Sequence, residues 1–137
     1  MTREVMTREE VIKLTAGARA EGRQPALSKA NLRRTDLSGA NLSGTDLSEA
    51  NLYDANLYDV DLSKADLHGA NLRRTDLHRT DLSAADLRGA ELYAADLSGA
   101  NLRGADLNGA VLSEANLRGA NLDRANLDGV IGLEGTE

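Results

Sequence analysis

Leucine occupies every fifth position of this chain, without interruption, from Leu27 to Leu127. A small residue, most often Ala, lies two positions before each Leu, and Gly is frequent two positions after it. Asn or Asp precedes the Leu in every repeat except those with Ala26, Glu91 and Val111. A fixed internal period of this kind decides the architecture before any local propensity is considered.

A five-residue period suits neither an α-helix nor a straight strand. On a helix, successive leucines would be rotated by about 140°, so no apolar stripe would form. On a straight strand, the odd spacing would alternate the leucines between the two faces. The chain must therefore turn a corner once per repeat with Leu always inside, and Gly, Asn, Asp and Ser suit such turns. We predict an all-β solenoid, although Ala and Leu favour helices by propensity.

Composition restricts the core and the binding classes. Without Cys, Phe or Trp, the core must consist of Leu and Ala, and disulfides are excluded. The net charge of −6 argues against direct nucleic-acid binding. No segment approaches the roughly 18 apolar residues of a membrane span, and no signal peptide is recognisable. We expect a soluble cytoplasmic protein that does not bind membranes.

The repeats Ala40–Gly44 and Ala100–Gly104 share the pattern A-[DN]-L-x-x and resemble the pentapeptide-repeat family. Periodicity alone leaves the number of sides open. The resemblance implies a right-handed quadrilateral β-helix over residues 25–130, with four pentapeptides per coil and about five coils. With coils about 4.8 Å apart, the rod would be roughly 25 Å long. The resemblance also places the Leu and the small residue inside.

The N-terminal segment, residues 1–24, is expected to contain a short capping helix. Thr7 and Glu10 have the spacing of a capping box. We place the helix over about residues 8–16, ended by Gly17, and treat 18–24 as a linker. Its apolar side is predicted to comprise Val11, Leu14 and Ala18.

The C-terminal tail, residues 131–137, departs from the repeat. Gly132 stands where the next Leu is due, so only Ile131 and Leu133 remain to cover the last coil. Two outcomes stay open: a loop that caps a monomer, or an end-to-end homodimer through the C-terminal coil.

With four repeats per coil, residues twenty apart stack in columns, and one face is the most varied. We call it the Arg/Tyr strip, and its candidate interaction residues are Arg33, Arg34, Tyr53, Asp54, Arg73, Arg74 and Tyr93. Arg and Tyr in one column can stack as cation–π pairs, and both are enriched in interface hot spots. The alternative is that these side chains only solvate one another and avoid columns of like charge.

A second face carries an acidic column made of Asp46, Asp66, Asp86 and Asp106. Stacked carboxylates can bind cations or imitate a phosphate backbone. The alternative is that these positions take Asn or Asp because such side chains bond to the nearby backbone.

No catalytic, cofactor or metal site is predicted. His68 and His78 lie half a coil apart, hence on opposite faces, and cannot share a metal. No nucleophile–base pair is recognisable, and such a solenoid offers no obvious concave pocket. We therefore predict a non-enzymatic structural or protein-interaction rod with an unidentified protein partner.

The alternative function comes from the family resemblance. Some pentapeptide-repeat proteins are acidic DNA mimics that inhibit or protect DNA gyrase. This chain differs from them in lacking Phe in the core and a long C-terminal dimerisation segment.

Overall fold

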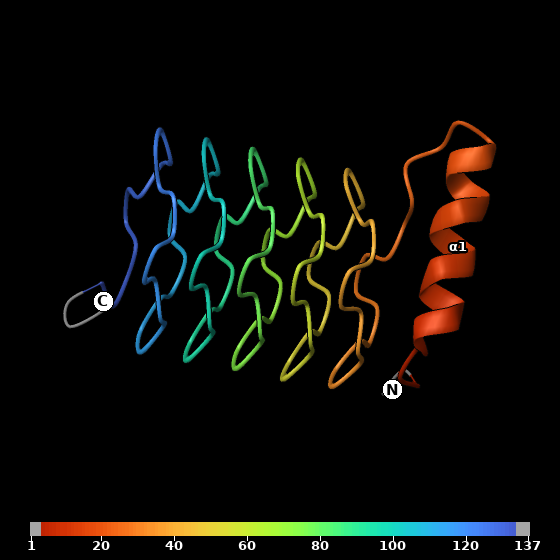
Figure 1. Ribbon diagram of the computed structural model, residues 1–137, viewed down its shortest axis with the longest axis horizontal. Coiled ribbons are helices and arrows are strands. Elements are labelled where there is room, and N and C mark those ends of the chain that lie inside the picture. The colour runs from red at the N-terminus through yellow and green to blue at the C-terminus, as the bar shows by residue number, and fades with distance from the viewer. Residues whose placement is uncertain (1–3, 134–137) are drawn as a thin grey trace.

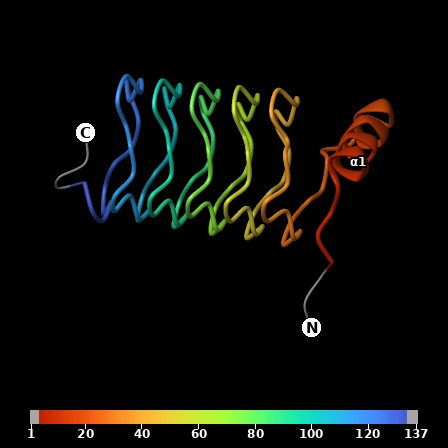
Figure 2. The ribbon, with the colours of Figure 1, turned by 60° about the horizontal axis from the view of Figure 1, so that its bottom comes forward.

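The computed structural model describes residues 4–133, which form one helix followed by stacked coils. Helix α1 spans Arg8–Ala20. The coils contain single-residue β-bridges rather than continuous strands. They succeed one another along the long axis, with α1 beyond the first coil (Figure 1). Figure 2 shows the same succession from a second direction.

The spacing of the bridges defines the coil. Each bridge is parallel and joins residues twenty positions apart, from Ala26 with Asp46 to Val111 with Ile131. Twenty residues are four pentapeptides, so each turn of the solenoid contains four repeats. Side chains that are twenty apart in sequence therefore lie in columns along the axis.

The backbone of each repeat is paired in two directions. Within a coil, Ala55 N–H donates to the carbonyl of Leu52 at 3.0 Å and closes a turn. Between coils, Leu52 N–H donates to Asn71 O at 2.8 Å, and Asp54 N–H donates to Arg73 O at 3.0 Å. The same pattern recurs from repeat to repeat, so the polar backbone inside the rod is satisfied.

The interior is a stack of leucines with small residues between them, as the composition predicted. Every repeat leucine from Leu27 to Leu112 is buried, and the adjoining positions hold buried Ala, Thr or Val60. Thr75 and Thr80 donate their hydroxyls to the carbonyls of Leu52 and Leu57, both at 2.7 Å. At these two positions the core accepts a polar residue because a carbonyl of the preceding coil is within reach.

Helix α1 lies against the first coil. The capping box predicted at Thr7 and Glu10 is confirmed, with both reciprocal hydrogen bonds present. Val11 is fully buried and belongs to the same apolar cluster as the leucines. Arg19 donates to the carbonyls of Asn41 at 3.0 Å and Ser43 at 2.8 Å. These bonds satisfy acceptors that no preceding coil can reach.

The predicted end of the helix at Gly17 is wrong. The helix continues to Ala20, and Glu21 is its C-cap. A glycine inside a helix costs only about 1 kcal/mol, which the burial of Ala18 and the Arg19 bonds offset.

The predicted apolar side of the helix is also partly wrong. Leu14 is 36% exposed, whereas Thr15 is buried. The buried side comprises Val11, Thr15 and Ala18. Thr15 can occupy an apolar position because its hydroxyl donates to the carbonyl of Ile12 at 3.0 Å.

The last coil is less buried than the others. Ile131 still bridges Val111, but it is 57% exposed, and Leu133 is 37% exposed. Gly132 lies against Ser113, whose backbone nitrogen would be 2.6 Å from an added Cβ. A leucine therefore cannot continue the repeat there. The remainder of the predicted tail, 134–137, lies outside the described residues, as do residues 1–3.

None of the described residues forms a helix that is both long and apolar enough to cross a membrane.

Candidate functional site

The turn of each repeat fixes the direction of the outward side chains. The Asn or Asp before the Leu accepts, through Oδ1, a hydrogen bond from the N–H two residues later. On the Arg/Tyr strip, Asn51 holds the N–H of Tyr53 at 3.1 Å and Asn71 holds that of Arg73 at 3.2 Å. Tyr53 and Arg73 are therefore presented on the same face, one coil apart.

Arg73 is the most restrained side chain of the strip. Its Cζ lies 5.7 Å from the ring centroid of Tyr53, within the range of a cation–π contact. Its Nε donates to Asn71 Oδ1 at 3.1 Å and lies 3.6 Å from Glu91 Oε2. The predicted Arg/Tyr stacking is thus present between these two residues.

The strip is hollowed rather than flat, contrary to the expectation of no concave pocket. The open hollow has a volume of about 500 Å³ and is lined by Arg33, Asn51, Tyr53, Asn71, Arg73, Arg74 and Tyr93. Five of the seven predicted strip residues therefore meet in one depression.

The remaining two strip residues pair with each other. Arg34 Nε lies 3.7 Å from Asp54 Oδ2, and both side chains are well exposed, so the pair adds little stability. Within residues 4–133, Arg74 makes no ion pair, which leaves its guanidinium available at the hollow.

The strip has a side chain at every left-handed turn position, whereas the other faces combine Gly with such side chains. The second residue after each Leu has a positive φ throughout the solenoid. Other faces have Gly at several of these positions, whereas the strip has side chains at all five, namely Arg34, Asp54, Arg74, Ala94 and Glu114. A side chain in this left-handed region costs roughly 1 kcal/mol.

The charge of the strip also differs from that of the whole chain. The whole face on which the strip lies carries four arginines and the carboxylates of Asp54, Glu91 and Glu114. Its net charge is therefore +1, on a chain of net charge −6. The strip is therefore the face best suited to meet an acidic or aromatic surface.

The acidic column forms as predicted, but its carboxylates are engaged locally. Each of its Asp residues accepts the N–H two positions later through Oδ1, at Ser48, His68, Arg88 and Asn108. The interpretation that these positions bond to the nearby backbone is confirmed. Asp86 is further held by Arg88, whose hydrogen bond lowers the pKa of that carboxyl below its usual value.

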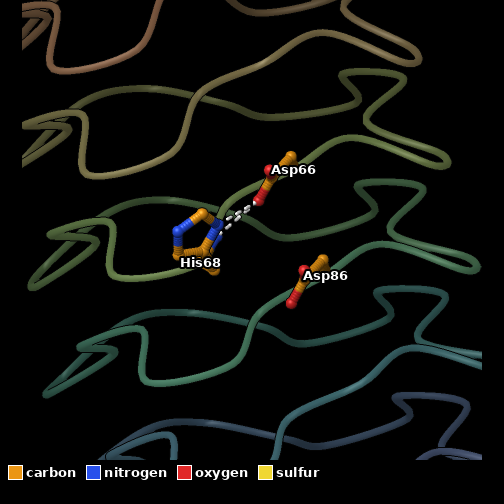
Figure 3. A group of neighbouring side chains, drawn as sticks. All are labelled: Asp66, His68 and Asp86. Carbon is orange, nitrogen blue, oxygen red and sulfur yellow. Dashed lines mark hydrogen bonds and ion pairs between the residues drawn. The ribbon is translucent and has the colours of Figure 1, made fainter.

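Two histidines take part in clusters that the sequence interpretation missed. His68 Nδ1 lies 2.7 Å from Asp66 Oδ1, and Asp86 approaches from the next coil (Figure 3). The hydrogen bond to Asp66 raises the pKa of His68.

An equivalent cluster on the opposite face consists of Asp76, His78 and Asp96. The spacing of the two histidines excludes only a metal shared between them, and no carboxylate partner was considered for either. The sequence pattern that indicates such a cluster is D-L-H with a second Asp twenty residues after the first.

Solved structures of similar proteins show the same architecture. This chain is 33% identical to the pentapeptide repeat protein Rfr23 from the cyanobacterium Cyanothece 51142, with a TM-score of 0.80, covering 90% of this chain and 96% of that one. It is 36% identical to a pentapeptide repeat protein of the Arabidopsis thaliana thylakoid lumen, with a TM-score of 0.66 and coverage of 68% and 65%.

A third similar structure is HetL, a pentapeptide repeat protein involved in heterocyst differentiation regulation in Nostoc sp. strain PCC 7120. The identity is 37% and the TM-score 0.61, and the match covers 81% of this chain but 59% of HetL. No curated protein matches the sequence.

The family model for pentapeptide repeats matches residues 26–63, 55–92 and 95–131. Proteins of this family fold as right-handed quadrilateral β-helices and are generally structural or interaction proteins rather than enzymes. The chain belongs to the pentapeptide repeat family.

Proposed function

We propose that this protein is a non-enzymatic interaction rod of about five coils, capped at one end by α1, that binds a protein partner through the Arg/Tyr strip. The observation that carries the proposal is the hollow in which Tyr53, Arg73 and Tyr93 converge. Tyr and Arg supply much of the binding energy at protein interfaces. A rod with a uniform leucine core provides a rigid support on which little ordering cost accompanies binding.

The strip favours a partner with acidic and aromatic groups. Arg74 makes no ion pair within residues 4–133 and can form a paired hydrogen bond with a carboxylate. Tyr93 is 45% exposed, and its ring offers apolar area next to that charge. Binding would bury the ring of Tyr93 and pair the guanidinium of Arg74 without breaking an existing ion pair.

The test compares partner capture by three forms of the full chain. The strip variant is Tyr53→Ala/Tyr93→Ala, which leaves the net charge unchanged. The control is Arg103→Ala/Asp123→Ala, which removes an exposed ion pair of 2.7 Å on the opposite face and also preserves net charge. Each tyrosine that acts as a hot spot should contribute at least about 1 kcal/mol, or roughly fivefold in affinity.

Loss of a partner from the strip variant and its retention by the control supports the proposal. Identical partner sets for all three forms refute it.

The second candidate, an acidic mimic of DNA that acts on gyrase, is favoured by the acidic column. The face that contains the column carries a net charge of −4. Its carboxylates, however, repeat at about 4.8 Å, whereas phosphates repeat at about 3.4 Å along one strand. A supercoiling assay separates the two candidates, because inhibition by micromolar protein would favour the mimic over the interaction rod.

The choice between a monomer and an end-to-end homodimer stays a prediction. Ile131 and Leu133 are the exposed apolar residues at the C-terminal end. Light scattering of the wild type and of Ile131→Asp decides it, because only a dimer formed through this end would lose mass on substitution.

A further inference from the structure

The structure points to a metal site outside the Arg/Tyr strip. We propose that Asp76, His78 and Asp96 form a surface site for a divalent transition-metal ion of the Zn²⁺ class. One ligand atom from each of these residues lies within 4.8 Å of the other two. An imidazole nitrogen with two carboxylate oxygens is a donor set that suits zinc, and water completes the coordination.

The distances require only small movements. Ligands about 2.0–2.1 Å from a tetrahedral zinc lie about 3.4 Å from one another. His78 Nδ1 and Asp76 Oδ1 are 2.6 Å apart in the hydrogen-bonded form, so they separate by less than about 1 Å when the ion enters. Asp96 approaches from the next coil, and its ligand oxygen already lies within 4.8 Å of the other two ligand atoms.

The proton in this contact has a defined destination. In the metal-free form Nδ1–H donates to Asp76 Oδ1. When zinc takes that position, a neutral imidazole binds through Nδ1 and carries its proton on Nε2 instead. A protonated imidazole releases one proton to solvent. No oxidant or further reactant is needed.

Neighbouring side chains hold the ligands in position. The ring of Tyr58 stacks on that of His78, with centroids 4.2 Å apart and planes inclined by 32°. Ser98 donates its O–H and N–H to Asp96 Oδ1, at 2.6 and 3.0 Å. Within residues 4–133, Asp96 Oδ2 accepts no hydrogen bond and is free for the ion. Such orienting partners commonly change metal affinity by about 10–100-fold.

The related cluster on the opposite face, shown in Figure 3, supplies an internal comparison. Asp66, His68 and Asp86 have the same spacing. There, Arg88 binds both oxygens of Asp86, through Nε at 2.8 Å and Nη2 at 2.5 Å. The third ligand is thus occupied, and a fixed positive charge opposes a cation. We expect the cluster around His78 to bind zinc more tightly than the cluster around His68.

The test is calorimetric titration of the tag-free, full-length chain with ZnCl₂ after removal of bound metal. The variants His78→Gln and Asp96→Asn remove one ligand each, and His68→Gln is the matched control. The wild type should bind one ion in its tightest step. Each ligand variant should weaken that step by at least about tenfold, while the control leaves it unchanged.

A variant that gains a binding site separates the loss of a ligand from a loss of folding, because an unfolded chain would not gain a site. Arg88→Ser frees Asp86 and should add a second zinc ion per chain with an affinity similar to the first. Two results overturn the proposal: the absence of binding by the wild type at millimolar zinc, or binding that both ligand variants retain. Circular dichroism establishes that each variant is folded.

Discussion

The substitution of threonine by valine should have opposite effects at two buried positions of the rod. Thr45 and Thr75 occupy equivalent positions of their repeats and are 0% and 1% exposed. Thr75 donates its hydroxyl to the carbonyl of Leu52, twenty-three residues earlier, at 2.7 Å. For Thr45 the corresponding residue is Gly22, which lies in the turn after α1 rather than in a coil. Accordingly, Thr45 Oγ1 is buried without a hydrogen bond among the described residues.

The expected changes in the free energy of unfolding follow from the hydrogen bonding of the two hydroxyls. A buried hydroxyl without a partner destabilises the fold by about 1–3 kcal/mol, whereas a satisfied hydrogen bond contributes about 0.5–1.5 kcal/mol net. Valine fits the position, since Val60 occupies it in another repeat with 1% exposure. Thr45→Val should therefore raise the free energy of unfolding by about 1 kcal/mol, and Thr75→Val should lower it by a similar amount.

Urea unfolding followed by circular dichroism measures both changes. For a slope of about 2 kcal/mol per molar urea, the midpoints should move by roughly 0.5 M in opposite directions. Thr80→Val is the control, because Thr80 donates to Leu57 at 2.7 Å and should behave like Thr75. Shifts of the same sign for Thr45→Val and Thr75→Val would refute the reasoning.

Further predictions concern the core, the first coil and one histidine. Leu77→Ala should lower the free energy of unfolding by about 2–5 kcal/mol. Leu127→Ala should lower it far less, because Leu127 is only partly buried. The midpoints of urea unfolding measure both changes. Arg19→Ala should lower the free energy of unfolding by about 1.5–3 kcal/mol, because Arg19 donates hydrogen bonds to two carbonyls. The same unfolding assay measures this change.

NMR titration should place the pKa of His68 above its ordinary value of 6.5, and Asp66→Asn should lower it. Since the folded pKa exceeds the unfolded one, this contribution to stability is complete below about 6.5 and disappears as pH rises through the folded pKa.

The fold was largely predictable because one periodicity determines it. A leucine at every fifth position admits only a chain that turns inward at each repeat. The bridges join residues twenty apart and so define the four-repeat coil that the family resemblance implies. The helix boundary was not predictable, because Gly17 is a local stop signal that contacts made by Ala18 and Arg19 override. Local signals near a helix end are weak against tertiary contacts.

The candidate sites were predictable as columns but not as shapes. The spacing of twenty brought the strip residues together, yet it did not show that their side chains enclose a hollow. The cluster around His78 was missed because the two histidines were compared only with each other, and not with the Asp residues of their own columns. The repeat pattern shows which residues of neighbouring coils lie in one column, but not the direction that each side chain takes.

The central claim is that the Arg/Tyr strip contacts a protein partner, and site-specific photo-crosslinking tests it most directly. A photoreactive residue is placed at Tyr93 or, as a control, at Arg103 on the opposite face; their exposures are 45% for the residue and 47% for the side chain. Our account predicts a discrete heterologous protein adduct from position 93 that is absent from position 103. Equal adducts from both positions, or none from position 93, would contradict it.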